Sequence, residues 1–216
     1  MSEGKRLSIL GDSISTYQDI SNNPTYHSTL YYNPYFYRPP FPVEKTYWHR
    51  LMDVFGFTLC VNNSWSGGNL SGVDDADSGV NRVRYLSNNH GEDPDIIIVF
   101  MGANDVGRGI HIDVFSADYE SVLKTIKSQY PYARVCCVNL PDRDTALKTR
   151  TKCYNLAIYE AVKNAGENFF VADLFHSRLN NDFYYMNTVD GLHPDEDGMK
   201  YIAEMIEQAI RQQLQL

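Results

Sequence analysis

The run Ile96-Ile97-Ile98-Val99-Phe100 is continuously apolar and rich in β-branched residues. Such a run is typical of a strand that other elements cover on both faces, as in a parallel sheet. Similar runs recur along the chain, and segments with helical periodicity separate them. Because strands that alternate with helices form parallel sheets, we expect helices on both faces of one sheet. The strand candidates are 6–10, 57–61, 95–101, 133–139 and 168–174.

Helix boundaries are predicted from residues that start or stop helices. The first helix should end at Gly56, since glycine favours the left-handed position that follows a last turn. The second should begin near Ser116, which could accept the first backbone hydrogen bonds as an N-cap. A third helix should begin near Asp144. The last should carry Pro194 in its first turn, where proline fits best.

The composition favours one compact domain, spanning 1–216, with a globular core. The 19 Lys+Arg against 27 Asp+Glu give a net charge of −8 and argue against nucleic acid or an anionic membrane as partner. No apolar run reaches the length of a membrane span, and the polar N-terminus lacks the apolar core of a secretion signal. We therefore expect no membrane span and a cytoplasmic location.

The cysteines and histidines show no metal-binding spacing. Cys136 and Cys137 are adjacent in a predicted strand, so their side chains should point to opposite faces of the sheet. Together with Cys60 and Cys153 they show no CxxC spacing, and we expect buried free thiols. The six histidines form no HxH or HExxH pattern. The sequence therefore predicts neither a metal nor an organic cofactor.

The first chemically suggestive loop is Gly11-Asp12-Ser13, directly after a predicted strand. In parallel sheets, ligands bind beyond the carboxyl ends of the strands. A serine there, behind a glycine that permits a tight turn, can present its hydroxyl at the edge of the sheet. If a helix follows, its free N–H groups favour a nearby anion. The same residues also fit a serine that merely caps a helix.

Two further loops offer hydrogen-bond donors. One contains Gly67 and Gly68, whose backbone N–H groups could face a ligand, although paired glycines also suit a flexible turn. The other contains Asn104 and Asp105, and the asparagine amide could donate to a developing oxyanion. The alternative for Asn104 is a local Asx turn.

The fourth loop contains Asp190 and His193, three positions apart. On a turn, the carboxylate can reach Nδ1 of the imidazole and leave Nε2 facing a serine. The pair could also arise by accident or be half of a metal site, and Asp190 could simply cap the last helix. Taken together, the four loops supply a nucleophile, oxyanion donors, and a base with an orienting acid, which acyl transfer requires.

Matched in order, these blocks resemble the GDSL/SGNH hydrolases, a family of serine esterases. The matching residues are Gly11-Asp12-Ser13, Gly67, Gly102-x-Asn104-Asp105 and Asp190-x-x-His193. The resemblance implies a three-layer α/β/α sandwich around a flavodoxin-like, doubly wound parallel sheet of five strands. It also implies carboxylic ester hydrolysis without a cofactor.

The resemblance assigns roles to individual residues. Ser13 would be the nucleophile, His193 the general base, and Asp190 the acid that orients the histidine. The oxyanion hole would combine the Ser13 N–H, the Gly67 N–H and the Asn104 amide. Gly68 is the alternative backbone donor, and the spacing Asn62-x-x-x-Ser66-Gly67 favours Gly67.

An aromatic insertion spans about 17–45 and holds many of the tyrosines and several prolines. Its rings could form a satellite core, which is the simpler interpretation. They could also line the substrate cleft, where tyrosine hydroxyls suit a polar ligand such as a sugar. We therefore expect a small-molecule or carbohydrate ester substrate, with a short acyl group and an O-acetylated carbohydrate favoured.

Two alternatives use the same loops. An O-acyltransferase would employ the same triad, with an alcohol replacing water in the second half-reaction. A non-catalytic flavodoxin-like module would bind phosphate or a nucleotide at the Gly11 loop. The binding module leaves Asn104 and the pair of Asp190 and His193 without a function.

Overall fold

A computed structural model describes residues 4–17, 32, 41–142, 147–177 and 187–215 of the chain. Its centre is one sheet of five strands, all parallel, in the order β2-β1-β3-β4-β5. This order is that of a flavodoxin-like doubly wound sheet, so the predicted fold is confirmed. The strands are β1 (Arg6–Gly11), β2 (Thr58–Ser64), β3 (Ile96–Phe100), β4 (Arg134–Val138) and β5 (Phe169–Ala172).

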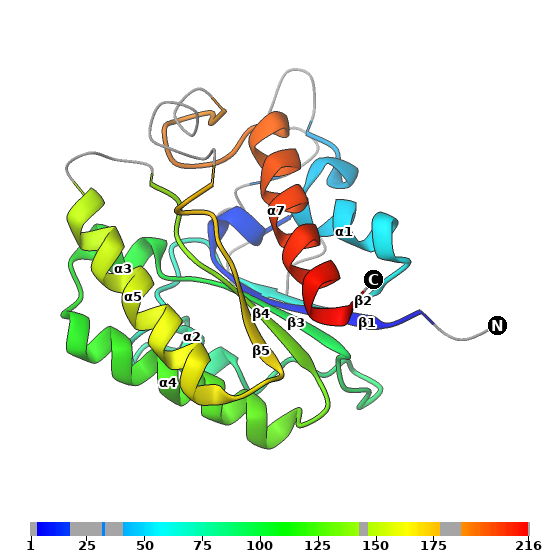
Figure 1. Ribbon diagram of the computed structural model, residues 1–216, viewed down its shortest axis with the longest axis horizontal. Helices are drawn as coiled ribbons and strands as arrows, with labels where there is room; N and C mark the ends of the chain where they lie inside the picture. Colours follow the sequence, from blue (N-terminus) through cyan, green and yellow to red (C-terminus); the bar gives the residue numbers. More distant parts are fainter. Residues whose placement is uncertain (1–3, 18–31, 33–40, 143–146, 178–186, 216) are drawn as a thin grey trace.

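Helices cover both faces of the sheet and complete the three layers (Figure 1). One face carries α1 (Tyr47–Phe55) and α7 (Glu196–Leu214). The opposite face carries α2 (Gly79–Arg82), α3 (Ala103–Arg108), α4 (Ile112–Gln129) and α5 (Lys148–Ala165). Two short 3₁₀ helices, η1 (Ser13–Ser15) and η3 (Val43–Lys45), pack against the same hydrophobic cluster as α1 and α7.

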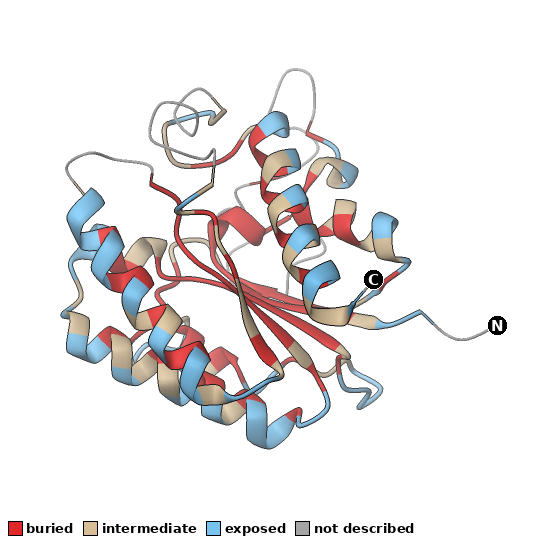
Figure 2. Cartoon of the chain, in the orientation of Figure 1, coloured by how far each residue is buried: buried red, intermediate tan, exposed pale blue. Residues whose placement is uncertain are grey.

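The sheet separates two hydrophobic clusters, and the strands β1, β3 and β4 are buried over most of their length (Figure 2). In β3, Ile98 and Phe100 face α1 and α7, whereas Ile97 and Val99 face α4 and α5. Each fully buried aliphatic side chain of this kind stabilises the fold by about 1.5–3 kcal/mol. A strand with both faces covered must therefore be apolar at every position, as this one is.

The two adjacent cysteines in β4 obey the same alternation. Cys136 packs in the cluster under α7 and Cys137 in the cluster under α4, both fully buried. The four thiols are free, but Cys153 is exposed on α5 and Cys60 is half-buried. The expectation of buried thiols was therefore wrong for Cys153, because its side of the helix faces solvent.

Two helix starts differ from the predictions, and a third cannot be compared. The second helix begins at Ile112 with His111 as its N-cap, so Ser116 lies inside it. The last begins at Glu196 behind the cap Asp195, whose carboxylate accepts from the Gly198 N–H at 2.9 Å. Pro194 therefore precedes the cap instead of filling the first turn. The position near Asp144 lies outside the described residues, and α5 is described from Lys148.

Within the described part of the chain, no helix combines the length and the apolar character needed to cross a bilayer. Most of the insertion at 17–45 also lies outside the described residues. Its described aromatic residues, Tyr17, Tyr32 and Phe41, are buried in the cluster beneath α7.

Candidate active site

Ser13 stands at the carboxyl end of β1, in the first position of η1. Asp12 is the N-cap of this short helix, because its carboxylate accepts from the Ile14 N–H at 3.0 Å. The serine hydroxyl is therefore not used as the cap. Position 11 requires glycine because there is no room for a side chain, and not because of a positive φ. A Cβ there would lie 2.6 Å from the Oγ atoms of both Ser15 and Ser64.

A hydrogen-bonded chain links the three residues predicted to form the triad. Ser13 Oγ lies 2.8 Å from His193 Nε2, and His193 Nδ1 lies 2.8 Å from Asp190 Oδ2. Because Nδ1 faces a carboxylate, it carries the ring proton, and Nε2 is left to accept from the serine. Ser13 and His193 are each 8% exposed, so little water competes for this contact.

The loop that carries Asp190 and His193 is a narrow turn. An isolated antiparallel bridge joins Thr188 to Pro194, and the Val189 N–H donates to the His193 carbonyl at 2.9 Å. This loop leads into α7, whereas the other three motif loops directly follow β1, β2 and β3. Its ends are held by Tyr32, whose hydroxyl donates to the Pro194 carbonyl at 2.7 Å. The sequence offered no signal for this contact.

The second motif forms a β-turn in which only one of the two glycines keeps a free N–H. The Gly68 N–H donates to the Trp65 carbonyl at 3.1 Å and closes the turn. Gly67 takes the third position with φ +74, the conformation that a type II turn reserves for glycine. Its N–H forms no hydrogen bond with the part of the chain that the structure describes. This geometry favours Gly67 over Gly68 as a donor to a ligand.

Asn104 and Asp105 connect this turn to α3. The Asn104 amide donates to the Gly68 carbonyl at 3.0 Å, which uses one of its two hydrogens. The buried Asp105 accepts from the N–H groups of Leu70 and Ser71 at 2.8 and 3.0 Å. Burial raises the pKa of Asp105, and these two hydrogen bonds oppose the shift. This role of Asp105 was not predicted from its sequence context.

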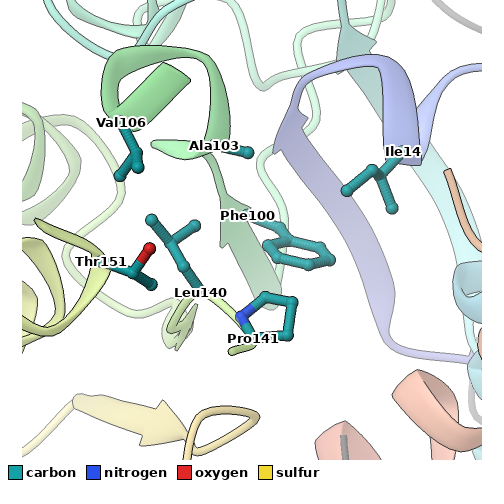
Figure 3. A pocket seen from close by; sticks show the side chains of 7 residues that line it. All are labelled: Ile14, Phe100, Ala103, Val106, Leu140, Pro141 and Thr151. Carbon is teal, nitrogen blue, oxygen red and sulfur yellow. The ribbon is translucent and has the colours of Figure 1, made fainter. Parts of the chain in front are cut away.

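A small apolar pocket lies between the residue that follows Ser13 and the residue that precedes Asn104 (Figure 3). It has about 10 Å³ of free volume, which is room for one water-sized group. Ile14, the neighbour of Ser13, stands on one side, and Ala103, the neighbour of Asn104, stands on another. The remaining lining residues are Phe100, Val106, Leu140, Pro141 and Thr151.

No group of three or more His, Cys, Asp or Glu side chains that could hold a metal occurs among the residues described. The described residues at this edge of the sheet offer a hydroxyl, an imidazole, a carboxylate and several N–H donors.

Residues 5–210 match the model of the family described as GDSL-like lipase/acylhydrolase. The chain belongs to this family. Membership makes the protein a carboxylic ester hydrolase and agrees with the order of its four motifs. No curated protein sequence matches the chain significantly.

Solved structures with the same fold are similar to the hydrolase over most of its length. A protein described as a GDSL-like lipase from Bacteroides ovatus has 24% identity and a TM-score of 0.74, with 96% of this chain and 98% of that chain covered. A psychrotrophic esterase from Pseudoalteromonas has 18% identity and a TM-score of 0.66, with 98% and 100% covered.

A carbohydrate esterase family 2 enzyme with a carbohydrate-binding domain, from Corynascus thermopiles, has 20% identity and a TM-score of 0.66. The alignment covers 98% of this chain and 67% of that chain. At these identities the three likenesses establish the fold, and the chemistry of individual residues must be argued from the site.

Proposed function

We propose that the protein hydrolyses short-acyl esters through an acyl-enzyme on Ser13. His193 accepts the Ser13 proton as Oγ attacks the ester carbonyl, and Asp190 stabilises the imidazolium that results. His193 then gives this proton to the leaving alcohol. A water molecule repeats the sequence on the acyl-enzyme and releases the acid. The observation that supports this mechanism is the unbroken chain of 2.8 Å contacts from Ser13 through His193 to Asp190.

The negative oxygen of the tetrahedral intermediate needs donors that are already in place. The Ser13 N–H is the first of a helix and has no partner within it. The Gly67 N–H and the second hydrogen of the Asn104 amide complete the proposed set. Donors fixed in advance cost no reorganisation during the reaction, and each typically contributes about 10²–10³-fold to kcat.

The acyl group should be short, because the pocket lined by Ile14 and Ala103, the chain neighbours of Ser13 and Asn104, holds only about one water-sized group. An acetyl methyl is close to this size, whereas a longer chain would have to displace buried side chains. Its walls are apolar, so an acyl methyl would lose no hydrogen bond on entering. Acetyl esters are therefore our proposed substrates.

A carbohydrate is the proposed alcohol. The structural likeness to a carbohydrate esterase supports this choice, as does the density of tyrosine in the insertion at 17–45. The described rings of Tyr17 and Tyr32 do not contribute directly, because their hydroxyls donate to the carbonyls of Phe41 and Pro194.

The mechanism is tested with Ser13→Ala and an active-serine phosphonate probe. The wild type should hydrolyse p-nitrophenyl acetate and take up one phosphonate, and the variant should do neither while melting at a similar temperature. Ser121→Ala, which removes an exposed serine on α4, is the control and should behave as wild type. A folded Ser13→Ala variant with wild-type turnover would refute the mechanism. Adding acceptor alcohols to the same assay measures acyl transfer against release of free acid.

The acyl pocket is tested with Leu140→Ala across p-nitrophenyl esters of increasing chain length. Enlarging the pocket should shift the preferred chain from acetyl towards butyryl, since Leu140 forms part of its wall. Leu123→Ala truncates an equally buried leucine in α4, in the same hydrophobic cluster but away from the pocket. An identical chain-length profile in the two variants would show that the acyl group binds elsewhere.

A further inference from the structure

Arg82, the last residue of the four-residue helix α2, is buried beneath the active-site loops. Its Nη2 donates to the Gly11 carbonyl at 3.0 Å and its Nε to the Asp77 carbonyl at 2.7 Å. Its Nη1 donates to the Asn63 carbonyl. Among the described residues, the guanidinium forms no ion pair with a carboxylate. Its hydrogen bonds to oxygen go to backbone carbonyls and to the Asn63 side chain.

A buried guanidinium without an ion-pair partner is costly, because its hydration must be replaced by protein dipoles. Burial lowers the pKa of Arg82 to about 10, and the nearby Asp12 opposes the shift. The side chain therefore stays charged at neutral pH. An apolar side chain of similar volume would avoid this cost. The charge and the planar set of donors thus call for an explanation other than packing.

The contacts of Arg82 converge on the strands that carry the three proposed oxyanion donors. The Gly11 carbonyl, which precedes Asp12 and Ser13, also accepts from the Trp65 N–H at 3.3 Å. Trp65 opens the turn that contains Gly67. One carbonyl therefore joins the nucleophile loop to the second loop, and Arg82 holds that carbonyl.

The same nitrogen of Arg82 also contacts the residue that follows β3. Arg82 Nη2 lies 3.4 Å from the sulfur of Met101, the residue before the Gly102 N-cap of α3 and two before Ala103, which leads to Asn104. The guanidinium also fills the space behind the second loop, since a Cβ on Gly68 would lie 3.1 Å from Nη2. Arg82 thus contacts the backbone that leads to Ser13 and Gly67, and it contacts the side chain of Met101, which precedes Asn104 by three residues.

We propose that Arg82 is a positioning residue for the oxyanion hole, holding the carboxyl ends of β1, β2 and β3 at the separation that the tetrahedral intermediate requires. This inference rests on the proposed function of Ser13, Gly67 and Asn104. Arg82 touches neither the substrate nor the reacting atoms. Its effect on the reaction passes through the Gly11 and Asn63 carbonyls.

The test compares Arg82→Lys and Arg82→Met with the wild type on p-nitrophenyl acetate. Lysine keeps a charge but cannot reach three carbonyls at once, so it should not rescue activity. Both variants should lose about 10- to 100-fold in kcat, the loss expected when donors are misplaced by up to about 1 Å. KM should change less than about threefold, because the donors act mainly in the transition state. Arg134→Lys and Arg134→Met, at the opposite end of the sheet, should match the wild type.

Wild-type kcat per folded molecule in either Arg82 variant, whatever its melting temperature, would overturn the proposal. Full rescue by lysine would overturn it as well, because the charge alone would then suffice. Failure of the proposed function would be seen separately, as retained activity in Ser13→Ala.

A measurement on the wild type covers the case in which neither Arg82 variant folds. With ¹⁵N-arginine, the Arg82 Nε–H resonance should be protected from exchange and should shift when a phosphonate occupies Ser13. The Arg134 Nε–H resonance should not shift. An unchanged Arg82 resonance in the phosphonate adduct would contradict coupling between the guanidinium and the oxyanion hole.

Discussion

Asp190 and Asp195 lie on either side of His193 and bind different partners. Asp190 accepts from the backbone N–H of His193 at 2.8 Å and also faces its ring. Asp195 accepts from the Gly198 N–H and caps α7. The capping role that the sequence allowed for Asp190 therefore belongs to Asp195. In the proposed triad, Asp190 holds the imidazole and its tautomer.

This division of labour gives a matched pair of variants. Asp190→Asn keeps the shape of the turn but removes the charge, so activity at neutral pH should fall by roughly 10³–10⁴-fold. Asp195→Asn should leave activity unchanged, because asparagine caps helices about as well as aspartate. Both variants should melt close to the wild type. Turnover and melting curves check this, and unchanged activity in Asp190→Asn would exclude the proposed triad.

Residues whose partners lie close in the sequence could be predicted, whereas residues whose partners are distant in the sequence could not. Asp190 and His193 share one turn, and the spacing between them is itself the signal. The resemblance to the GDSL/SGNH hydrolases predicted their approach to Ser13, whereas the rule that parallel strands present their carboxyl ends together applies to the other three motif loops. Arg82 and Tyr32 belong to no motif, and their acceptors are carbonyls far away in the sequence. Only the folded chain shows such contacts, since any residue can offer a carbonyl.

At the scale of elements, burial decided which predictions succeeded. β3 was predicted closely because both of its faces are covered and its composition leaves no alternative. The start of α4 was misplaced because its cap is His111, a residue that seldom caps helices. The six-residue helix α3 was not predicted at all, since it is too short to show periodicity and contains Gly107.

The insertion should influence catalysis through one hydrogen bond. Tyr32→Phe removes the donor to the Pro194 carbonyl, next to His193, and should lower kcat several-fold by loosening the histidine. Leaving that buried carbonyl unpaired should also cost about 1–3 kcal/mol of stability. Tyr17→Phe removes a similar bond, to Phe41, and should lower stability alone. Kinetics and denaturant unfolding of both variants test this, and equal kcat values would deny the insertion a role in placing His193.

The carboxyl ends of β4 and β5 hold a polar cluster whose contribution depends on pH. Burial acts to raise the pKa of Asp173, but hydrogen bonds from Asn139, Tyr159 and His176 outweigh it and lower the pKa. A carboxylate with a lowered folded-state pKa adds stability above its unfolded value, and this stability disappears as pH falls. Asp173→Asn should therefore be less stable than wild type at pH 7 and equally stable in strong acid. Urea unfolding across pH checks this, and a difference independent of pH would contradict it.

In the whole molecule, the hydrophobic core and the candidate active site occupy different parts of the sheet. Both hydrophobic clusters lie along the faces of the sheet, whereas the site occupies the carboxyl ends of β1, β2 and β3. The site loops can thus differ among relatives while the clusters keep the fold. This separation explains why the fold persists at identities of 18–24%.

The net charge of −8 should act on substrates before they reach the site. The segment that joins the second motif to α2 contains Asp74, Asp75 and Asp77, so carboxylates also lie near the reactive edge. These three carboxylates outnumber the nearby cations Arg82 and Arg108. Anionic esters should therefore be repelled at low ionic strength. The Debye length, over which charges interact before salt screens them, is about 30 Å at 0.01 M salt but only about 10 Å at 0.1 M.

The expected result is a rise of a few-fold in kcat/KM for an anionic acetyl ester between about 0.01 and 0.1 M salt. A neutral acetyl ester of similar size should show no change over the same range, because it carries no charge to be screened. Substrates differing only in a carboxylate remote from the scissile bond keep the chemistry constant. A fall in kcat/KM for the anionic ester with added salt would show attraction instead, and would mean that cations such as Arg108 dominate the field at the mouth of the site.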